Sequence, residues 1–146
     1  MSQVSFENRT VIVTGAGNGL GKAYALDLGS RGAKVVVNDL GGAVDGSGSG
    51  STPADEVVNE IIANGGEAVA NYDSVATKEG GESIVQTAID NFGTVDAVVN
   101  NAGILRDKSF AKMEEEDLNA IIDVHLKGTF FVCQPAFIQM KEQGYG

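Results

Sequence analysis

Four glycines at alternate positions follow a short apolar run near the start of the chain. Gly15, Gly17, Gly19 and Gly21 come directly after the β-branched residues 11–13. Because glycine has no Cβ, a backbone rich in glycine lets a phosphate group approach closely. Apolar residues at helical spacing begin at Leu20, so a helix is expected to start inside this segment and to present its N-terminal amides to an anion. The pattern predicts a strand, a phosphate-binding turn and a helix.

Two kinds of phosphate-binding turn compete for this pattern. A P-loop requires Gly-x-x-x-x-Gly-Lys-Ser/Thr, but aligning it on Gly21-Lys22 places Ala16 at its first glycine and Ala23 at its metal-binding hydroxyl. A dinucleotide-binding turn requires a second strand and an acidic residue about 20 residues further on. Asp39, at the end of the next apolar run, meets that requirement. The spacing therefore favours dinucleotide binding.

Other residue types that carry chemistry are sparse. His125, the only histidine, lies among apolar residues spaced as on one helix face, where a hydrogen-bonded core histidine is the more common role. Cys133 is the only cysteine, and because no neighbour would stabilise a thiolate we expect it to be a packing residue. The acidic residues 114–117 are typical of the first turn of a helix. No convergent set of ligands indicates a metal site.

Strand-like and helix-like apolar spacings alternate along the whole chain. Such alternation is typical of a parallel sheet with right-handed crossovers and helices on both faces. The expected fold class is α/β, a Rossmann-type doubly wound parallel sheet, of which this chain would form the N-terminal half with about four strands. We expect strands at residues 11–14, 35–38, 68–72 and 95–100, helices from Leu20, at 54–64 and ending at Gly93, a helix from 114 to about Met140 kinked at Pro135, and a surface loop at 41–53.

The charge and composition of the chain limit its partners. Its 146 residues carry 20 acidic and 10 basic side chains, a net charge of −10 without a basic cluster. This charge disfavours binding to nucleic acid or to an anionic membrane, and no apolar run approaches the length of a membrane span. A single cysteine cannot form an internal disulfide, and no signal-like segment opens the chain. We therefore expect an intracellular protein with a small-molecule ligand.

Four motifs, in order, resemble those of the short-chain dehydrogenase/reductase family. They are the glycine turn at 14–21, Asn38-Asp39, Asp73-Ser74-Val75, and Asn-Asn-Ala-Gly at 100–103. The resemblance covers essentially the whole chain, but only the first half of a family domain. Within the family, these segments and the glycine-rich loop look like the (3R)-hydroxyacyl-CoA dehydrogenase domains of peroxisomal multifunctional enzymes of type 2 and their bacterial relatives.

The resemblance implies that the four motifs bind NAD. The glycine turn would hold the pyrophosphate, the segment after the third strand would border the adenine, and the segment after the fourth would pack its backbone against the cofactor. Asp39 would accept hydrogen bonds from the adenosine ribose and repel the 2′-phosphate of NADP. The residues expected to contact NAD are Gly15, Asn18, Gly19, Leu20, Gly21, Asp39, Asp73, Ser74, Val75, Asn101, Ala102 and Gly103.

The chain departs from the family pattern at the catalytic residues. Family members use a Ser and a Tyr-x-x-x-Lys pair, in which the Tyr exchanges a proton and the Lys lowers its pKa. None of the three tyrosines, Tyr24, Tyr72 and Tyr145, has a lysine four residues later. His125 replaces the family's catalytic Asn, which suggests a proton relay or a helix-bending residue. We expect residues 1–146 to be an NAD-binding half-domain, truncated before the catalytic Ser and the Tyr-x-x-x-Lys pair.

Several functions stay open on the sequence alone. The first is the cofactor-binding part of an NAD-dependent oxidoreductase acting on a secondary alcohol or ketone, by resemblance a (3R)-3-hydroxyacyl-CoA. The others are a nucleotide-binding module that binds NAD without catalysis and an NADP-linked 3-oxoacyl reductase, while a methyltransferase-like fold does not call for the motif at 100–103. The resemblance implies a homo-oligomeric parent enzyme. The ending lacks a Ser-Lys-Leu-type signal, so we expect a cytoplasmic protein, with the peroxisome as the alternative.

Overall fold

The computed structural model describes residues 4–42, 45, 47–48 and 52–146. Within them, four strands form one parallel sheet in the order β3-β2-β1-β4. All pairs are parallel, so the carboxyl ends of the strands meet at one edge. The expected parallel α/β sheet is confirmed. The strands are β1 (Thr10–Thr14), β2 (Lys34–Asn38), β3 (Glu67–Asn71) and β4 (Ala97–Val99).

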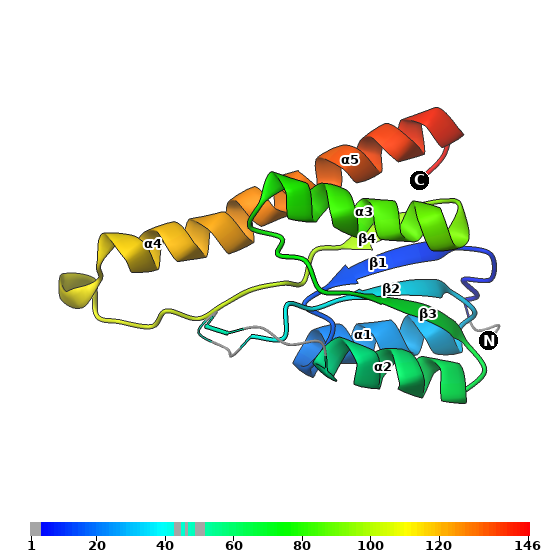
Figure 1. Cartoon of the computed structure of the whole chain (residues 1–146), viewed down its shortest axis with the longest axis horizontal. Helices are drawn as coiled ribbons and strands as arrows, with labels where there is room; N and C mark the ends of the chain where they lie inside the picture. Colours follow the sequence, from blue (N-terminus) through cyan, green and yellow to red (C-terminus); the bar gives the residue numbers. More distant parts are fainter. Residues whose placement is uncertain (1–3, 43–44, 46, 49–51) are drawn as a thin grey trace.

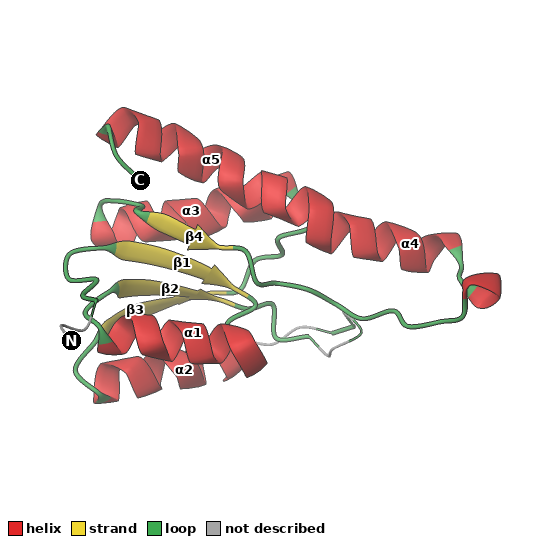
Figure 2. Cartoon of the chain, turned by 180° about the vertical axis from the view of Figure 1, so that it is seen from behind, coloured by secondary structure: helices red, strands yellow, loops and turns green. Residues whose placement is uncertain are grey.

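Helices cover both faces of this sheet, as the alternating pattern predicted (Figures 1 and 2). Two helices lie on one face, and two lie on the other. Part of the expected surface loop at 41–53 falls outside the described residues, and its last two residues already belong to a helix. The helices of the first face are α1 (Gly19–Ser30) and α2 (Thr52–Ala63), and those of the second are α3 (Lys78–Phe92) and α5 (Gly128–Gln143).

The alternation of side chains along β1 divides the core into two layers. Val11 and Val13 pack with residues of α1 and α2, whereas Ile12 packs with residues of α3 and α5. All three are at most 2% exposed. A parallel strand covered on both faces reads as a continuous apolar run, which is the feature that predicted it.

The fourth strand is shorter than the sequence predicted. β4 covers Ala97–Val99, not 95–100, and it pairs with β1 alone as the edge of the sheet. The backbone N–H of Val95 donates instead to Oε1 of Gln143 in α5, at 2.9 Å. This tertiary competitor lies 48 residues away in the sequence, so an apolar run could not reveal it. The third strand likewise ends at Asn71 and not at residue 72.

The chain after β4 forms an arm that projects beyond the sheet (Figure 1). A 3₁₀ turn η1 (Phe110–Lys112) leads into α4 (Glu115–Ile121), the π-helical turns η2 (Ile122–Lys127) and then α5. We expected a kink at Pro135, but α5 continues through it and the irregular turns are those of η2. Proline leaves the carbonyl four residues earlier without its helical donor. That carbonyl, of Phe131, lies against Gly81 of α3, where a side chain would not fit.

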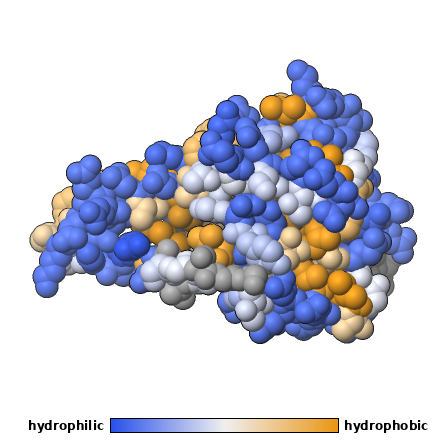
Figure 3. Space-filling model, viewed as in Figure 1, coloured by the Kyte–Doolittle hydropathy of each residue, from blue (hydrophilic) through white to orange (hydrophobic). Residues whose placement is uncertain are grey.

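The helical rod from Glu115 to Gln143 is long and apolar. Its most apolar window has a mean hydropathy of 1.2 and is 17% buried, so by length and composition alone the rod could cross a membrane. The sequence predicted a helix of about this length, but no apolar run in it approaches the length of a membrane span. A core helix of a layered fold meets the same criterion, and α5 buries Val132 and Ala136 against α3. Figure 3 shows apolar surface between the arm and the body of the molecule.

The acidic run at 114–117 forms the first turn of α4, as predicted. A carboxylate oxygen of Asp117 accepts a hydrogen bond from the N–H of Glu114 at 3.3 Å. Asp117 is also only 4% exposed and pairs with Nζ of Lys108 at 2.7 Å and with Nη1 of Arg106 at 3.7 Å. These ion pairs fasten the segment before α4 to the helix. The sequence did not single out Asp117 from its exposed acidic neighbours.

Candidate functional site

A cavity of about 330 Å³ opens at the carboxyl ends of the strands. In open α/β sheets, ligands bind at this edge where the strand order reverses, here between β1 and β4. Leu20 and Gly21 do not line the cavity and lie behind it in the first turn of α1. The other ten residues expected to contact NAD do line it, and they are Gly15, Asn18, Gly19, Asp39, Asp73, Ser74, Val75, Asn101, Ala102 and Gly103.

The glycine turn needs glycine for two different reasons. Gly15 and Gly19 have φ values of +62° and +55°, in the left-handed region that other residues rarely adopt. A Cβ at Gly15 would lie 2.8 Å from Cα of Ala102, and a Cβ at Gly21 would overlap the carbonyl oxygen of Gly15. By contrast, apart from its chain neighbours and the backbone of its own helix, no described atom lies within 4 Å of the Cβ position of Gly19. The turn is therefore packed on one side and open at Gly19.

The start of α1 offers hydrogen-bond donors at this open side. The N–H groups of the first helical turn, from Gly19 to Gly21, have no carbonyl partner within the helix. Asn18 occupies the N-cap position, but its side chain makes no capping hydrogen bond. Unpaired amides and the helix dipole together favour an anion at this position. The turn can hold a phosphate group.

Thr14 and Asn101 tie the glycine turn to the end of β4. Nδ2 of Asn101 donates to the carbonyl oxygens of Thr14 and Gly15, at 3.0 Å each. Oγ1 of Thr14 accepts from the backbone N–H of Asn101 at 3.2 Å and of Ala102 at 3.1 Å. We expected only the backbone of Asn101 to matter. Its side chain and the Thr14 hydroxyl are structural parts of the site that the sequence did not indicate.

The carboxylate of Asp39 bridges two loops at the end of β2. Its Oδ2 accepts from the N–H of Gly17 at 2.8 Å, and its Oδ1 accepts from the N–H of Gly41 at 2.7 Å. Each carboxylate oxygen has a second lone pair, so Asp39 can accept further hydrogen bonds from a ligand. The two backbone donors hold the carboxylate at the edge of the cavity.

Asp73 belongs to a network built on two buried asparagines. Nδ2 of Asn38 donates to Oδ1 of Asn71 and to the carbonyl oxygen of Asp73, both at 2.9 Å. Oδ2 of Asp73 accepts from Nδ2 of Asn71 at 3.0 Å and from Oγ of Ser83 at 2.7 Å. Within the described residues, Oδ1 of Asp73 has no partner. Asn38 and Asn71 pair in register on β2 and β3, a signal visible only once the strands are aligned.

His125 contacts the wall of the cavity from the π-helical turns η2. Its Nε2 lies 3.1 Å from the backbone N of Ile104 and 3.0 Å from the carbonyl oxygen of Ile104. The tautomer decides whether the ring accepts from the one or donates to the other. The ring also packs on Gly103, where a Cβ would lie 2.8 Å from Cε1. His125 is exposed and not the core residue that the apolar stripe suggested. A role as a proton relay stays a prediction.

Cys133 lies half-buried on α5, with its Sγ 3.1 Å from Nδ2 of Asn100. This contact agrees with a packing role next to the motif at 100–103. In the part of the chain that the structure describes, no group of three or more His, Cys, Asp or Glu side chains could hold a metal ion.

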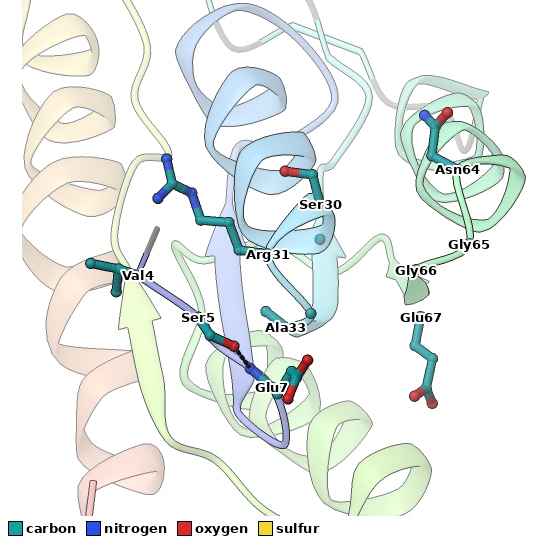
Figure 4. Close-up of a pocket in the computed structure, with 12 residues that line it drawn as sticks. Val4, Ser5, Glu7, Ser30, Arg31, Ala33, Asn64, Gly65, Gly66 and Glu67 are labelled. Atoms are coloured by element: carbon teal, nitrogen blue, oxygen red, sulfur yellow. Dashed lines mark hydrogen bonds between the residues drawn. The ribbon is translucent and has the colours of Figure 1, made fainter. Parts of the chain in front are cut away.

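A larger hollow, of about 450 Å³, lies at the opposite edge of the sheet (Figure 4). Its walls are residues 4–7, the turn before β2 and the turn before β3. Arg31, the cation in this wall, already pairs with Asp27 at 2.9 Å. The hollow is far from the glycine turn, and its polar groups serve the turns that surround it. We therefore place the ligand site in the smaller cavity, where the open turn and the Asp39 carboxylate meet.

Comparisons with known proteins agree with this geometry. The family model described as short chain dehydrogenase matches residues 9–146. The chain is 57% identical, over 145 residues, to the peroxisomal multifunctional enzyme type 2 of Mus musculus, covering 99% of this chain and 19% of that protein. It is 57% identical, over 143 residues, to the peroxisomal hydratase-dehydrogenase-epimerase of Saccharomyces cerevisiae, covering 98% of this chain and 16% of that protein.

A solved structure has the same fold. It is 7α-hydroxysteroid dehydrogenase complexed with NADH and 7-oxoglycochenodeoxycholic acid, with a TM-score of 0.85 and 30% identity over 96% of this chain and 51% of that one. The chain thus spans about half of this solved relative and less than a fifth of the two peroxisomal relatives. The resemblance of the four motifs is confirmed over nearly the whole chain. The chain belongs to the short-chain dehydrogenase/reductase family.

Proposed function

We propose that this chain is the cofactor-binding part of an NAD-dependent oxidoreductase that interconverts a secondary alcohol and a ketone. The observation that carries the proposal is the cavity at the carboxyl edge of the sheet, where an open glycine turn and a fixed carboxylate lie side by side. A family member of the same fold is complexed with NADH and a 7-oxo steroid, which supports both the cofactor and the reaction class.

In this proposal, different parts of the cavity bind different parts of the cofactor. The amides of Gly19 to Gly21 hold the pyrophosphate, and Asp39 accepts hydrogen bonds from the adenosine ribose. The segment from Asp73 to Val75 borders the adenine, and Oδ1 of Asp73 is an acceptor suited to its amino group. The backbone of Ala102 and Gly103 then faces the nicotinamide half. The nicotinamide ring supplies or accepts the hydride.

The preference for NAD over NADP follows from Asp39. The 2′-phosphate of NADP would meet a carboxylate that two backbone N–H groups hold in place, at 2.8 Å and 2.7 Å. Two negative charges about 4 Å apart repel by about 1 kcal/mol in water and by about 4 kcal/mol near a protein surface. Rotation of the carboxylate out of the way would break both hydrogen bonds. We therefore expect NADP to bind at least about tenfold more weakly.

For the substrate we propose a (3R)-3-hydroxyacyl-CoA, oxidised to the 3-oxoacyl-CoA. The two relatives that carry multifunctional or dehydrogenase names support this class, and their names also support the peroxisome as the compartment. No tyrosine of this chain has the lysine that a family acid/base pair requires. In the proposed enzyme that pair lies in the half of the family domain that this chain does not match. We propose a homo-oligomer for the whole enzyme.

Calorimetry of the chain with NAD and NADP tests cofactor binding. We expect NAD to bind and to raise the unfolding temperature, because a ligand at about 100 times its Kd adds about 2.7 kcal/mol of stability. Asp39→Asn should reduce the preference for NAD, whereas Asp90→Asn, which changes an exposed carboxylate of α3, should not. If NAD gives neither heat of binding nor thermal stabilisation, the proposal is refuted. A preference for NADPH would favour a 3-oxoacyl reductase.

The substrate is tested on the gene product extended beyond Gly146. NADH absorbance should rise with NAD and a (3R)-3-hydroxyacyl-CoA, and not with the (3S) isomer. If the absorbance stays constant with every hydroxyacyl-CoA while NAD still binds, the substrate assignment is wrong. If the extended product also has no Tyr-x-x-x-Lys pair, the result favours a nucleotide-binding module without catalysis.

A further inference from the structure

The chain contains two Asn-Gly pairs, Asn18-Gly19 and Asn64-Gly65. In an Asn-Gly pair, the backbone nitrogen of the glycine can attack the side-chain amide carbon of the asparagine, because no Cβ stands in the way. The reaction needs a side chain free to turn and a backbone amide without a hydrogen-bond partner. The fold treats the two pairs differently in both respects.

At the first pair, both reacting groups are free. Asn18 is exposed, has an extended backbone with φ −145° and ψ 171°, and makes no side-chain hydrogen bond at its N-cap position. The N–H of Gly19 opens α1 and has no partner within the described residues. Apart from the chain neighbours and the backbone of α1, no described atom lies within 4 Å of the Cβ position of Gly19. The bond from Lys22 N–H to the Asn18 carbonyl, at 3.1 Å, restrains the backbone rotation that ring closure needs.

At the second pair, both reacting groups are engaged. Nδ2 of Asn64 donates to the carbonyl oxygen of Glu60 at 2.9 Å. The N–H of Gly65 donates to the carbonyl oxygen of Ile62 at 2.9 Å, at the end of α2. Reaction at Asn64 would have to break both bonds. The same dipeptide is therefore open at one site and protected at the other.

We propose that Asn18 is a site of spontaneous deamidation in the folded protein, located inside the glycine turn. The nitrogen of Gly19 forms a bond to Cγ of Asn18, and the side-chain nitrogen leaves as ammonia. Water then opens the resulting succinimide at one of its two carbonyls and gives aspartate or isoaspartate. Nothing is oxidised or reduced, and water is the only co-reactant.

The product carries a carboxylate where the cavity is suited to an anion. An aspartate at the N-cap favours the helix, so the free energy of unfolding should not fall. The same charge repels a pyrophosphate, and isoaspartate also lengthens the backbone of the turn. This consequence rests on the proposed function. The proposed function implies that bound NAD shields Gly19 and slows deamidation, so Asn18 should deamidate mainly in the cofactor-free protein.

Peptide mapping by mass spectrometry tests the modification. The chain is incubated at mildly alkaline pH, folded or in urea, and deamidation is followed in the peptides that contain Asn18 and Asn64. In urea the two pairs should react at similar rates. In the folded chain Asn18 should react at least about tenfold faster than Asn64, as expected if Asn64 must first open hydrogen bonds worth about 1.4 kcal/mol. Equal rates at the two sites in the folded chain would overturn the proposal.

Two variants test the consequence separately. Asn18→Asp should raise the Kd for NAD by about tenfold, the effect of about 1.4 kcal/mol, without lowering the unfolding temperature. The control Asn64→Asp should leave the Kd unchanged. Unchanged NAD affinity in Asn18→Asp would overturn the consequence. If the unaltered chain does not bind NAD, the proposed function fails, and the ratio of deamidation rates still decides the modification.

Discussion

The hydroxyl of Thr14 is the contact whose loss should most directly loosen the glycine turn. Thr14 is 1% exposed, and its Oγ1 accepts from the backbone N–H groups of Asn101 and Ala102. Thr14→Val has nearly the same shape but leaves the N–H of Ala102 without an acceptor, whereas the N–H of Asn101 keeps the carbonyl oxygen of Val99, at 3.0 Å. A buried donor left unpaired costs about 1–3 kcal/mol, and the added methyl recovers about 0.8 kcal/mol. Asn101 also loses one of its two hydrogen bonds, worth about 0.5–1.5 kcal/mol, so we expect the free energy of unfolding to fall by about 1–4 kcal/mol.

Thr10 on the same strand provides the matched control. It is also 1% exposed, but its Oγ1 contacts only Oγ1 of Thr94, at 3.1 Å. Thr94 keeps a second partner, Oδ2 of Asp96, at 3.3 Å. Thr10→Val therefore strands no backbone group and should cost about 1 kcal/mol or less.

Urea unfolding followed by far-UV circular dichroism measures both variants. The midpoint should fall much more for Thr14→Val than for Thr10→Val, with the slope unchanged in both. Amide exchange at Ala102 should accelerate only in Thr14→Val. An equal loss of stability in the two variants would refute the reasoning, because the fall would then reflect any buried threonine and not the stranded amide of Ala102.

Three further substitutions address the arm and α5. Lys108 lowers the pKa of Asp117, so the charged carboxylate stabilises the fold at neutral pH. This contribution is lost as the pH falls through the folded pKa, below about 4. Asp117→Asn should therefore be less stable than the unaltered chain at pH 7, and the difference should vanish in unfolding curves at acid pH. His125→Ala should speed amide exchange at Ile104, and unchanged exchange would contradict the bond from that amide to the ring. Gly81→Ala should cost about 1–3 kcal/mol in urea unfolding by overpacking α3 on α5, and no loss would show that the helices can separate freely.

The order of the elements could be predicted because local patterns encode it. Continuous apolar runs indicated strands covered on both faces, and the glycines after residue 14 placed the start of α1 within one residue. Asp39 was placed at the cavity because the carboxyl ends of parallel strands share one edge. In each case the signal and the structure lie within a few residues of each other.

Most of the missed features join residues that are distant in the sequence. Thr14 bonds to Asn101 across 87 positions, and Val95 donates to Gln143 across 48. Asp117 looked like its exposed neighbours until the arm brought Lys108 beside it. Such pairs have no local periodicity, so the sequence offered no signal for them.

By itself, the sequence determined the alternating α/β pattern, the glycine turn before the first helix and the acidic residue after the second strand. Each of these depends on backbone freedom or burial that a short segment carries with it. The tertiary structure decided which polar groups are paired: Asn101 fastens the turn, Asp39 is held by two amides, and Asn18 is left open while Asn64 is closed. Hydrogen bonding depends on which atoms meet in space, and only the folded chain brings them together.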